Sequence, residues 1–219
     1  VFLNFKYVKN LKNNNKNIAC HVGLPCVLKN QYNNRLTKSL KNKKLQIFLY
    51  GGSQGSKNLN NFLIKLLNKL PQNYIKKMKI IIQSPTMQKK YIANKLKKIG
   101  IENEINDFFI DIHKILNSSD IVISRSGAGT INDIILSQVP SILVPISKSI
   151  YNHQYHNAKF LFDKNAAELI EEKEFDLDTS YQKCKELIDN IDQRVIFINN
   201  LKLIKVLDTN SLMLKKILQ

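Results

Sequence analysis

From Leu45 onward, short runs of apolar residues alternate with longer segments in which apolar residues recur every three or four positions. The short runs are rich in Ile, Val and Leu and do not alternate strictly with polar residues, which is typical of strands covered on both faces. The spacing in the longer segments predicts helices. The predicted strands are residues 46–50, 79–83, 121–124, 141–144 and 167–170. The predicted helices are residues 59–70, 87–99, 112–118, 130–137 and 153–163.

This β-α-β-α order predicts an α/β fold. Right-handed crossovers between the strands give a Rossmann-like parallel sheet with helices on both faces. In such a sheet the ligand crevice lies at the carboxyl ends of the strands. We therefore expect the functional residues in the loops that follow strands.

The two ends of the chain differ from this pattern. Residues 1–28 hold two apolar segments, an Asn/Lys turn and the break Gly23-Leu24-Pro25, and the first residue is Val1 rather than Met. We expect residues 1–28 to be the end of an amino-terminal domain, otherwise missing, and a linker. Residues 29–205 should form the Rossmann-like domain. Residues 206–219 should form a short apolar helix that packs back toward the amino-terminal domain.

Composition excludes several classes of protein. At 43% hydrophobic residues the 219-residue chain has ample material for a core, so it is neither a disordered tail nor a basic nucleic-acid arm. No apolar run approaches the roughly 18 to 20 residues of a membrane-spanning helix, so we expect a soluble, cytoplasmic protein. Cys20, Cys26 and Cys184 form no CxxC pair and are interpreted as reduced thiols.

The formal charge of +17 reflects 34 Lys and Arg against 17 Asp and Glu. Lys is spread through the chain, usually beside Asn, whereas a nucleic-acid reader concentrates Arg and aromatic residues in one segment. We interpret the charge as a composition bias that produces solvated faces, and expect no nucleic-acid partner. A basic surface would still attract anionic lipid headgroups.

Three loops after strands are candidates for chemistry. The first, Tyr50-Gly51-Gly52-Ser53-Gln54-Gly55-Ser56, opens a helix. Glycines let a ligand approach the backbone, and the free amides and dipole of a helix start favour an anion, so a diphosphate is the natural ligand. The loop matches neither the P-loop nor the G-x-G-x-x-G spacing. The alternative is a tight turn that needs small residues.

The second loop is Ser124-Arg125-Ser126-Gly127-Ala128-Gly129-Thr130, with Asn132 and Asp133 expected in the first turn of the next helix. Asp133 there would either stabilise the helix dipole or accept hydrogen bonds from two ribose hydroxyls. Two Gly/Ser turns on one sheet together favour a nucleotide diphosphate site.

The third loop, residues 145–157, runs from a strand into a helix. Gln154 and Asn157 lie three positions apart on one helical face, where they would read sugar hydroxyls or form an ordinary exposed amide pair. His153 and His156 share this spacing but have no third ligand nearby, so we expect no metal, and no cofactor.

Three segments in order, GGSQGSKNLN, FFIDIHKILNSSDIVISRSGAGTINDI and NHQYHNA, resemble the MurG family over about residues 18–170. These enzymes are inverting N-acetylglucosaminyltransferases that complete the lipid-linked peptidoglycan precursor at the cytoplasmic membrane face. The resemblance implies a GT-B architecture of two Rossmann-like domains, of which this chain would hold the carboxyl-terminal, donor-binding one. It also implies peripheral attachment to the anionic inner membrane and a lipid-linked MurNAc-pentapeptide acceptor bound by the missing domain.

The resemblance also implies which residues bind UDP-GlcNAc. Ser53 would contact the diphosphate, the backbone of Phe109 would read uracil, Asp133 would accept the ribose in place of the family's usual Glu, and Gln154 would bind GlcNAc hydroxyls. The full implied set is Gly52, Ser53, Gln54, Gly55, Phe109, Ser126, Gly127, Ala128, Gly129, Thr130, Ile131, Asn132, Asp133 and Gln154.

Two departures from the family limit the expected activity. The linker motif, typically Gly-Asn-Pro-Val-Arg, reads Gly23-Leu24-Pro25-Cys26-Val27, so Val27 replaces an Arg that would meet the diphosphate. The domain that would hold the catalytic base lies outside these residues, so no catalytic residue is assigned. We expect this chain alone to bind UDP or UDP-GlcNAc weakly and to transfer nothing.

Three alternatives remain open. A non-catalytic UDP-sugar-binding subunit of a split glycosyltransferase would share all the loops above. A UDP-sugar epimerase would need clustered acids and a His around the sugar, which these loops lack. A basic nucleic-acid binder would show steeply salt-dependent oligonucleotide binding that UDP does not displace.

Overall fold

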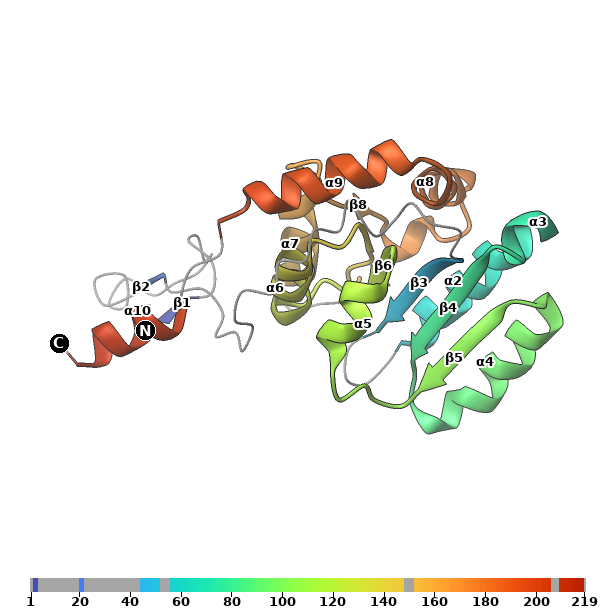
Figure 1. Ribbon diagram of the computed structural model, residues 1–219, viewed down its shortest axis with the longest axis horizontal. Coiled ribbons are helices and arrows are strands. Elements are labelled where there is room, and N and C mark those ends of the chain that lie inside the picture. Colours follow the sequence, from blue (N-terminus) through green and yellow to red (C-terminus); the bar gives the residue numbers. More distant parts are fainter. Residues whose placement is uncertain are drawn as a thin grey trace. The chain divides into compact units, whose positions relative to one another are not determined.

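The computed structural model describes residues 2–3, 20–21, 44–51, 56–147, 152–205 and 209–218 (Figure 1). The chain divides into two units, residues 33–203 and residues 1–32 together with 204–219. In the smaller unit, β1 (Phe2–Leu3) pairs in parallel with β2 (Cys20–His21), and α10 spans Thr209–Ile217. All elements below belong to the larger unit.

A six-stranded parallel sheet in the order β5-β4-β3-β6-β7-β8 forms the centre of the larger unit. Its strands are β3 (Leu45–Tyr50), β4 (Met78–Gln83), β5 (Glu102–Asn106), β6 (Ile121–Ser124), β7 (Ser141–Leu143) and β8 (Glu168–Leu169). The predicted α/β class and parallel sheet are confirmed, and five strands were predicted to within one or two residues. The edge strand β5 was missed because its sequence, ENEIN, is polar and half-exposed.

Helices connect these strands. They are α2 (Lys57–Lys69), α3 (Gln72–Ile75), α4 (Thr86–Ile99), α5 (Ile112–Ser118), α6 (Ala128–Ser137), α7 (His153–Phe162), the 3-10 helix η3 (Glu172–Glu174), α8 (Asp178–Asp189) and α9 (Ile191–Leu203). Capping explains two of the boundaries. The hydroxyl of Ser56 accepts the backbone N–H of Leu59 at the start of α2, and Gly100 ends α4 at a φ of 80°, where glycine carries no strain.

Alternate residues of each strand face opposite layers of helices. Ile47 and Leu49 of β3 belong to a buried cluster with residues of α2, α4 and α8. The side chain between them, Phe48, is equally buried but points away from this cluster and contacts Phe109, in the loop before α5. Figure 1 shows α5, α6 and α7 grouped together, away from α2 and α4. Both faces of the inner strands are therefore covered, which accounts for their nearly uninterrupted apolar sequences.

The strand order reverses direction between β3 and β6. From β3 the chain moves outward to β4 and β5, and from β6 it moves the other way to β7 and β8. In open parallel sheets this reversal leaves a crevice at the carboxyl ends of the two central strands. Across the described ranges, no helix has the length and apolar character that crossing a membrane requires.

Candidate functional site

The loops that follow β3 and β6 begin side by side. Tyr50, the last residue of β3, is the register partner of Ser124, the last residue of β6. Of the first predicted loop, Tyr50, Gly51 and Ser56 are described, and residues 52–55 lie outside the described part of the chain. The first and second candidate loops therefore leave the sheet at its reversal point, where a ligand crevice is expected.

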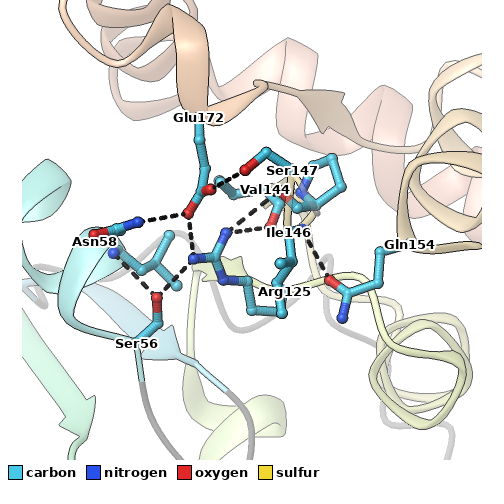
Figure 2. A network of polar contacts seen from close by, with 10 residues as sticks. Ser56, Asn58, Arg125, Val144, Ile146, Ser147, Gln154 and Glu172 are labelled. Atoms are coloured by element: carbon cyan, nitrogen blue, oxygen red, sulfur yellow. Dashed lines mark hydrogen bonds and ion pairs between the residues drawn. The ribbon is translucent and has the colours of Figure 1, made fainter. Parts of the chain in front are cut away.

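Arg125, in the second loop, joins the ends of these loops. Its backbone N–H donates to the carbonyl of Tyr50 at 3.3 Å, and its Nη2 donates to the hydroxyl of Ser56 at 2.7 Å. Its Nη1 donates to the carbonyls of Val144 and Pro145, at 3.1 and 3.4 Å, where the third loop begins. Only 6% of Arg125 is exposed. The guanidinium is thus a buried junction between the three predicted loops (Figure 2).

Glu172 of η3 neutralises this guanidinium. Its Oε1 accepts hydrogen bonds from Nη2 of Arg125 at 2.6 Å and from Nδ2 of Asn58 at 3.1 Å, and its Oε2 accepts from the hydroxyl of Ser147 at 2.8 Å. Burial raises the pKa of Glu172, but the hydrogen bonds from Arg125, Ser147 and Asn58 outweigh burial and leave that pKa below its ordinary value. One feature of the sequence points to Glu172, because it is a polar residue just after the predicted strand 167–170.

Ser126 ties the second loop to α7. Its hydroxyl donates to the backbone carbonyl of Gln154 at 2.8 Å, and its own carbonyl accepts from Nδ2 of Asn157 at 2.9 Å. Oε1 of Gln154 accepts from the backbone N–H of Ile146 at 3.1 Å. Gln154 and Asn157 are half-buried, so the alternative of an ordinary exposed amide pair is wrong. Together with Arg125, Ser126 brings the described parts of all three loops together.

Helix α6 begins two residues earlier than predicted, at Ala128, with Gly127 as its N-cap. Asp133 is therefore in the second turn, and no acid lies in the first turn. The alternative that Asp133 stabilises the helix start is wrong, because the dipole effect is confined to the first turn. Asp133 is left as a half-buried carboxylate without that compensation.

Two side chains share the surroundings of Asp133. Burial raises the pKa of Asp133, and the nearby His113 of α5 opposes that rise. Burial also raises the pKa of Tyr50, with a smaller contribution from the charge of Asp133. Nδ1 of His113 is buried and has no hydrogen-bond partner among the described residues. Among the described residues, the surroundings of Asp133 therefore include one buried polar atom, Nδ1 of His113, that makes no hydrogen bond.

Phe109 lies next to the end of β3. Its ring meets Phe48 edge-on, with centroids 5.7 Å apart, and Phe48 in turn stacks on Tyr50 at 5.6 Å. Such aromatic contacts fix the position of the segment before α5. They give the backbone of Phe109, the predicted reader of uracil, a rigid support.

The remaining predicted site residues are unequally placed. Gly127, Ala128, Thr130 and Asn132 are half-buried and Gly129 is exposed, at the start of α6. Ser126 and Ile131 have exposed fractions of 0% and 1%, so each acts here as part of the framework. The residues predicted to meet the diphosphate, namely Gly52, Ser53, Gln54 and Gly55, lie outside the described residues, as does Val27. Direct contacts with a ligand stay predictions for the whole set.

A hollow of about 440 Å³ adjoins the junction. Ser147, Tyr155, Glu171, Glu172 and Lys173 are among the residues that line it. Carboxylates and hydroxyls of this kind hydrogen-bond polyhydroxylated ligands such as sugars. Within the described ranges, no group of three or more His, Cys, Asp or Glu side chains is arranged to hold a metal ion.

Comparison with known proteins identifies relatives of this chain. The model of the glycosyltransferase family 28 C-terminal domain matches residues 46–202. A Campylobacter jejuni (strain 81-176) UDP-N-acetylglucosamine–N-acetylmuramyl-(pentapeptide) pyrophosphoryl-undecaprenol N-acetylglucosamine transferase is 31% identical over 164 residues, which are 74% of this chain and 46% of the relative. The protein of the same name from Rickettsia canadensis is 33% identical over 195 residues, 87% of this chain and 54% of the relative.

Solved structures share the fold. The crystal structure of Acinetobacter baumannii MurG matches with a TM-score of 0.73 and 23% identity, over 80% of this chain and 52% of that one. WaaG, a glycosyltransferase of lipopolysaccharide biosynthesis, matches with a TM-score of 0.62 and 16% identity, over 83% of this chain and 48% of that one. The resemblance to the MurG family and the predicted fold class are confirmed. The chain spans about half the length of the curated relatives it matches.

Proposed function

Because this chain belongs to glycosyltransferase family 28, whose C-terminal domain it contains, we propose that it is the donor-binding part of an N-acetylglucosaminyltransferase. The whole enzyme would move GlcNAc from UDP-GlcNAc to a lipid-linked MurNAc-pentapeptide in peptidoglycan synthesis. The names of the relatives that match 74% and 87% of the chain support this donor and this acceptor.

One observation carries the proposal. Hydrogen bonds from Arg125 and Ser126 draw together the flanks of three loops at the point where the strand order reverses. A nucleotide sugar has three parts, a base with ribose, a diphosphate and a hexose, and needs several loops to read them. The arrangement supports a nucleotide-sugar crevice better than it supports three unrelated turns.

In this proposal different segments of the chain bind the parts of the donor. The backbone of Phe109 reads uracil, Asp133 accepts the ribose hydroxyls, and Gln154 binds the hexose. Ser53 and its neighbours, with the first amides of α2, meet the diphosphate. Donors already in place around the diphosphate stabilise the charge that develops on UDP as it leaves.

The transfer itself would be inverting, with the C4 hydroxyl of MurNAc attacking the anomeric carbon of GlcNAc. A base on another domain would take the proton of that hydroxyl. We propose that residues 1–28 are the end of that domain and a linker, and that residues 206–219 pack back toward it. We further propose that the whole enzyme lies on the anionic cytoplasmic face of the membrane, to which the charge of +17 would contribute.

Ligand-dependent stabilisation tests donor binding. A ligand present at about 100 times its dissociation constant stabilises the folded chain by about 2.7 kcal/mol. For a chain of this size, that raises the melting temperature by about 5–11 °C. We expect this shift with saturating UDP-GlcNAc, a smaller one with UDP-glucose at the same concentration, and none with GDP-mannose or NAD.

Two variants localise the effect. Ser53→Ala should reduce the shift, because it removes the predicted diphosphate contact. Ser118→Ala is the matched control, since Ser118 accepts a hydrogen bond from Gln46 near the opposite, amino-terminal end of β3. Equal shifts with all four ligands, or no shift with UDP-GlcNAc, would contradict the proposal. So would GlcNAc transfer by the purified chain alone.

A further inference from the structure

Arg125 contacts one described residue on each side of residues 52–55, Tyr50 and Ser56. The backbone N–H of Arg125 holds the carbonyl of Tyr50 on one side, and Nη2 holds the hydroxyl of Ser56 on the other. Ser56 is also the N-cap of α2, because its hydroxyl accepts a hydrogen bond from the backbone N–H of Leu59 at 3.3 Å. A single residue of β6's loop therefore fixes the start of α2 relative to the end of β3.

Four of the five N–H groups of the guanidinium make hydrogen bonds. Of its five N–H groups, two donate to the carbonyls of Val144 and Pro145, and two donate to Ser56 and Glu172. The fifth, Nε–H, is buried and has no hydrogen-bond partner among the described residues. Lys has one ammonium group in place of this planar fork and cannot reach the four acceptors at once.

Glu172 makes burial of the guanidinium possible. The side chains of Arg125 and Glu172 are 8% and 14% exposed, so removing either one leaves a buried charge without its partner. Glu172 also accepts a hydrogen bond from Nδ2 of Asn58, in the first turn of α2. Arg125 and Glu172 thus hydrogen-bond to the start of α2 at two residues, Ser56 and Asn58.

We propose that Arg125 and Glu172 are positioning residues that hold the amino-terminal turn of α2 where the donor diphosphate binds. This inference rests on the proposed function and adds that different residues control binding of the diphosphate and of the nucleoside. Phe109 and Asp133, predicted to bind uracil and ribose, make no contact with the pair among the described hydrogen bonds and ion pairs. The pair should therefore control affinity for the diphosphate and leave affinity for the nucleoside nearly unchanged.

The test compares uridine with UDP on the full 219-residue chain. The dissociation constant of UDP is measured by titration calorimetry, and that of uridine by chemical-shift titration of the ¹⁵N-labelled chain. In Arg125→Lys we expect the UDP constant to rise about tenfold, which corresponds to about 1.4 kcal/mol. The uridine constant should change by less than about twofold. Glu172→Gln should shift the UDP constant in the same direction by a smaller factor, because it keeps the shape of the side chain and loses its charge.

The matched control is Arg194→Lys. Nη1 of Arg194 donates to the carbonyls of Leu187 and Ile188, so this substitution also breaks partly buried hydrogen bonds to backbone carbonyls. Arg194 lines a hollow with Leu45 and Met78, the first residues of β3 and β4, at the end of the sheet opposite the crevice. It should lower the melting temperature without changing the ratio of the two dissociation constants.

Each outcome decides the question. A UDP constant unchanged in both Arg125→Lys and Glu172→Gln, or an equal loss of UDP and uridine, would overturn the positioning role while leaving the proposed function intact. Failure of the unchanged chain to bind UDP would remove the proposed function and this inference with it. If Arg125→Lys does not fold, the ratio measured for Glu172→Gln decides alone.

Discussion

Replacing Asp133 with Asn removes a half-buried negative charge and nearly preserves the shape of the side chain. Burial raises the pKa of Asp133, which means that the folded chain pays to keep this carboxylate ionised. Its place in the second turn of α6 denies it the stabilisation of the helix start. We therefore expect Asp133→Asn to stabilise the free chain at neutral pH.

The same substitution should weaken binding of the donor. A carboxylate that accepts hydrogen bonds from ribose hydroxyls does so about twice as strongly as a neutral amide. Losing that difference costs about 1–1.5 kcal/mol, so the dissociation constants of uridine and UDP should both rise by about five- to thirteenfold. In the free chain, removal of an unfavourable charge commonly stabilises by about 0.5–2 kcal/mol, or about 1–8 °C in melting temperature at this chain length.

The stability difference between the original chain and Asp133→Asn should depend on pH. Because its pKa is raised in the folded state, Asp133 takes up its proton at a higher pH in the folded chain than in the unfolded one. Lowering the pH through that raised pKa therefore stabilises the original chain relative to Asp133→Asn. The advantage of the variant should be greatest at neutral pH and should vanish below the ordinary Asp value of 3.8.

Urea unfolding from pH 7 down to pH 3 measures the difference, with UDP binding measured in parallel at pH 7. Asp107→Asn is the matched control, because hydrogen bonds from Lys89 and Thr86 lower the pKa of Asp107 and the same substitution should destabilise there. A lower midpoint for Asp133→Asn at pH 7 would refute the argument from burial. A stabilised variant that binds UDP as tightly as before would refute the assignment of Asp133 to the ribose.

Three further predictions follow from single residues. Gly129→Ala should stabilise the free chain by about 0.5–1 kcal/mol, because a Cβ there meets nothing within 4 Å and Gly is a poor helix former. The same substitution should weaken UDP binding as measured by calorimetry, because the methyl group enters space predicted for the nucleotide. Gly100→Ala should lower the free energy of unfolding in urea by about 1 kcal/mol, because φ is 80° at this C-cap although the space is open. Burial raises the pKa of the Cys184 thiol to about 12, so in a variant lacking Cys20 and Cys26 a thiol reagent at pH 8 should label Cys184 only after denaturation.

The sequence predicts most of the fold because the sheet is covered on both faces. Runs such as residues 46–50 and 121–124 must be apolar on both sides, and that continuous pattern is easy to recognise. Strand β5 lacks this apolar pattern and is not predicted, because among the described strands it lies at the edge of the sheet and pairs on one side only, with β4. Helix α9 is not predicted for a different reason, because its apolar residues are spread around the helix and give no clear amphipathic period.

The site is predicted less completely, because its framework depends on contacts that are distant in sequence. The three loops are visible as Gly/Ser segments after strands, but Glu172 lies 47 residues from Arg125 and 114 from Asn58. Neither residue type nor spacing reveals such a pair. The start of α6 was misjudged because Gly129 is a weak helix former, while the extended Gly127 allows the helix to begin at Ala128.

The commitment of Arg125 bears on how the diphosphate is neutralised. The family resemblance implies an Arg at the position of Val27, and Arg125 is the obvious substitute by residue type. Its guanidinium, however, already makes four hydrogen bonds, and its charge is balanced by Glu172 at 2.6 Å. Turning it toward a ligand would break those bonds and leave Glu172 as a partly buried, unpaired carboxylate beside an incoming anion, which electrostatics strongly opposes. In the proposed donor site, the backbone amides at the start of α2 would therefore provide most of the stabilisation of the diphosphate. This dependence is the reason why the geometry of α2, and the pair that fixes it, should matter more here than in relatives that keep the linker Arg.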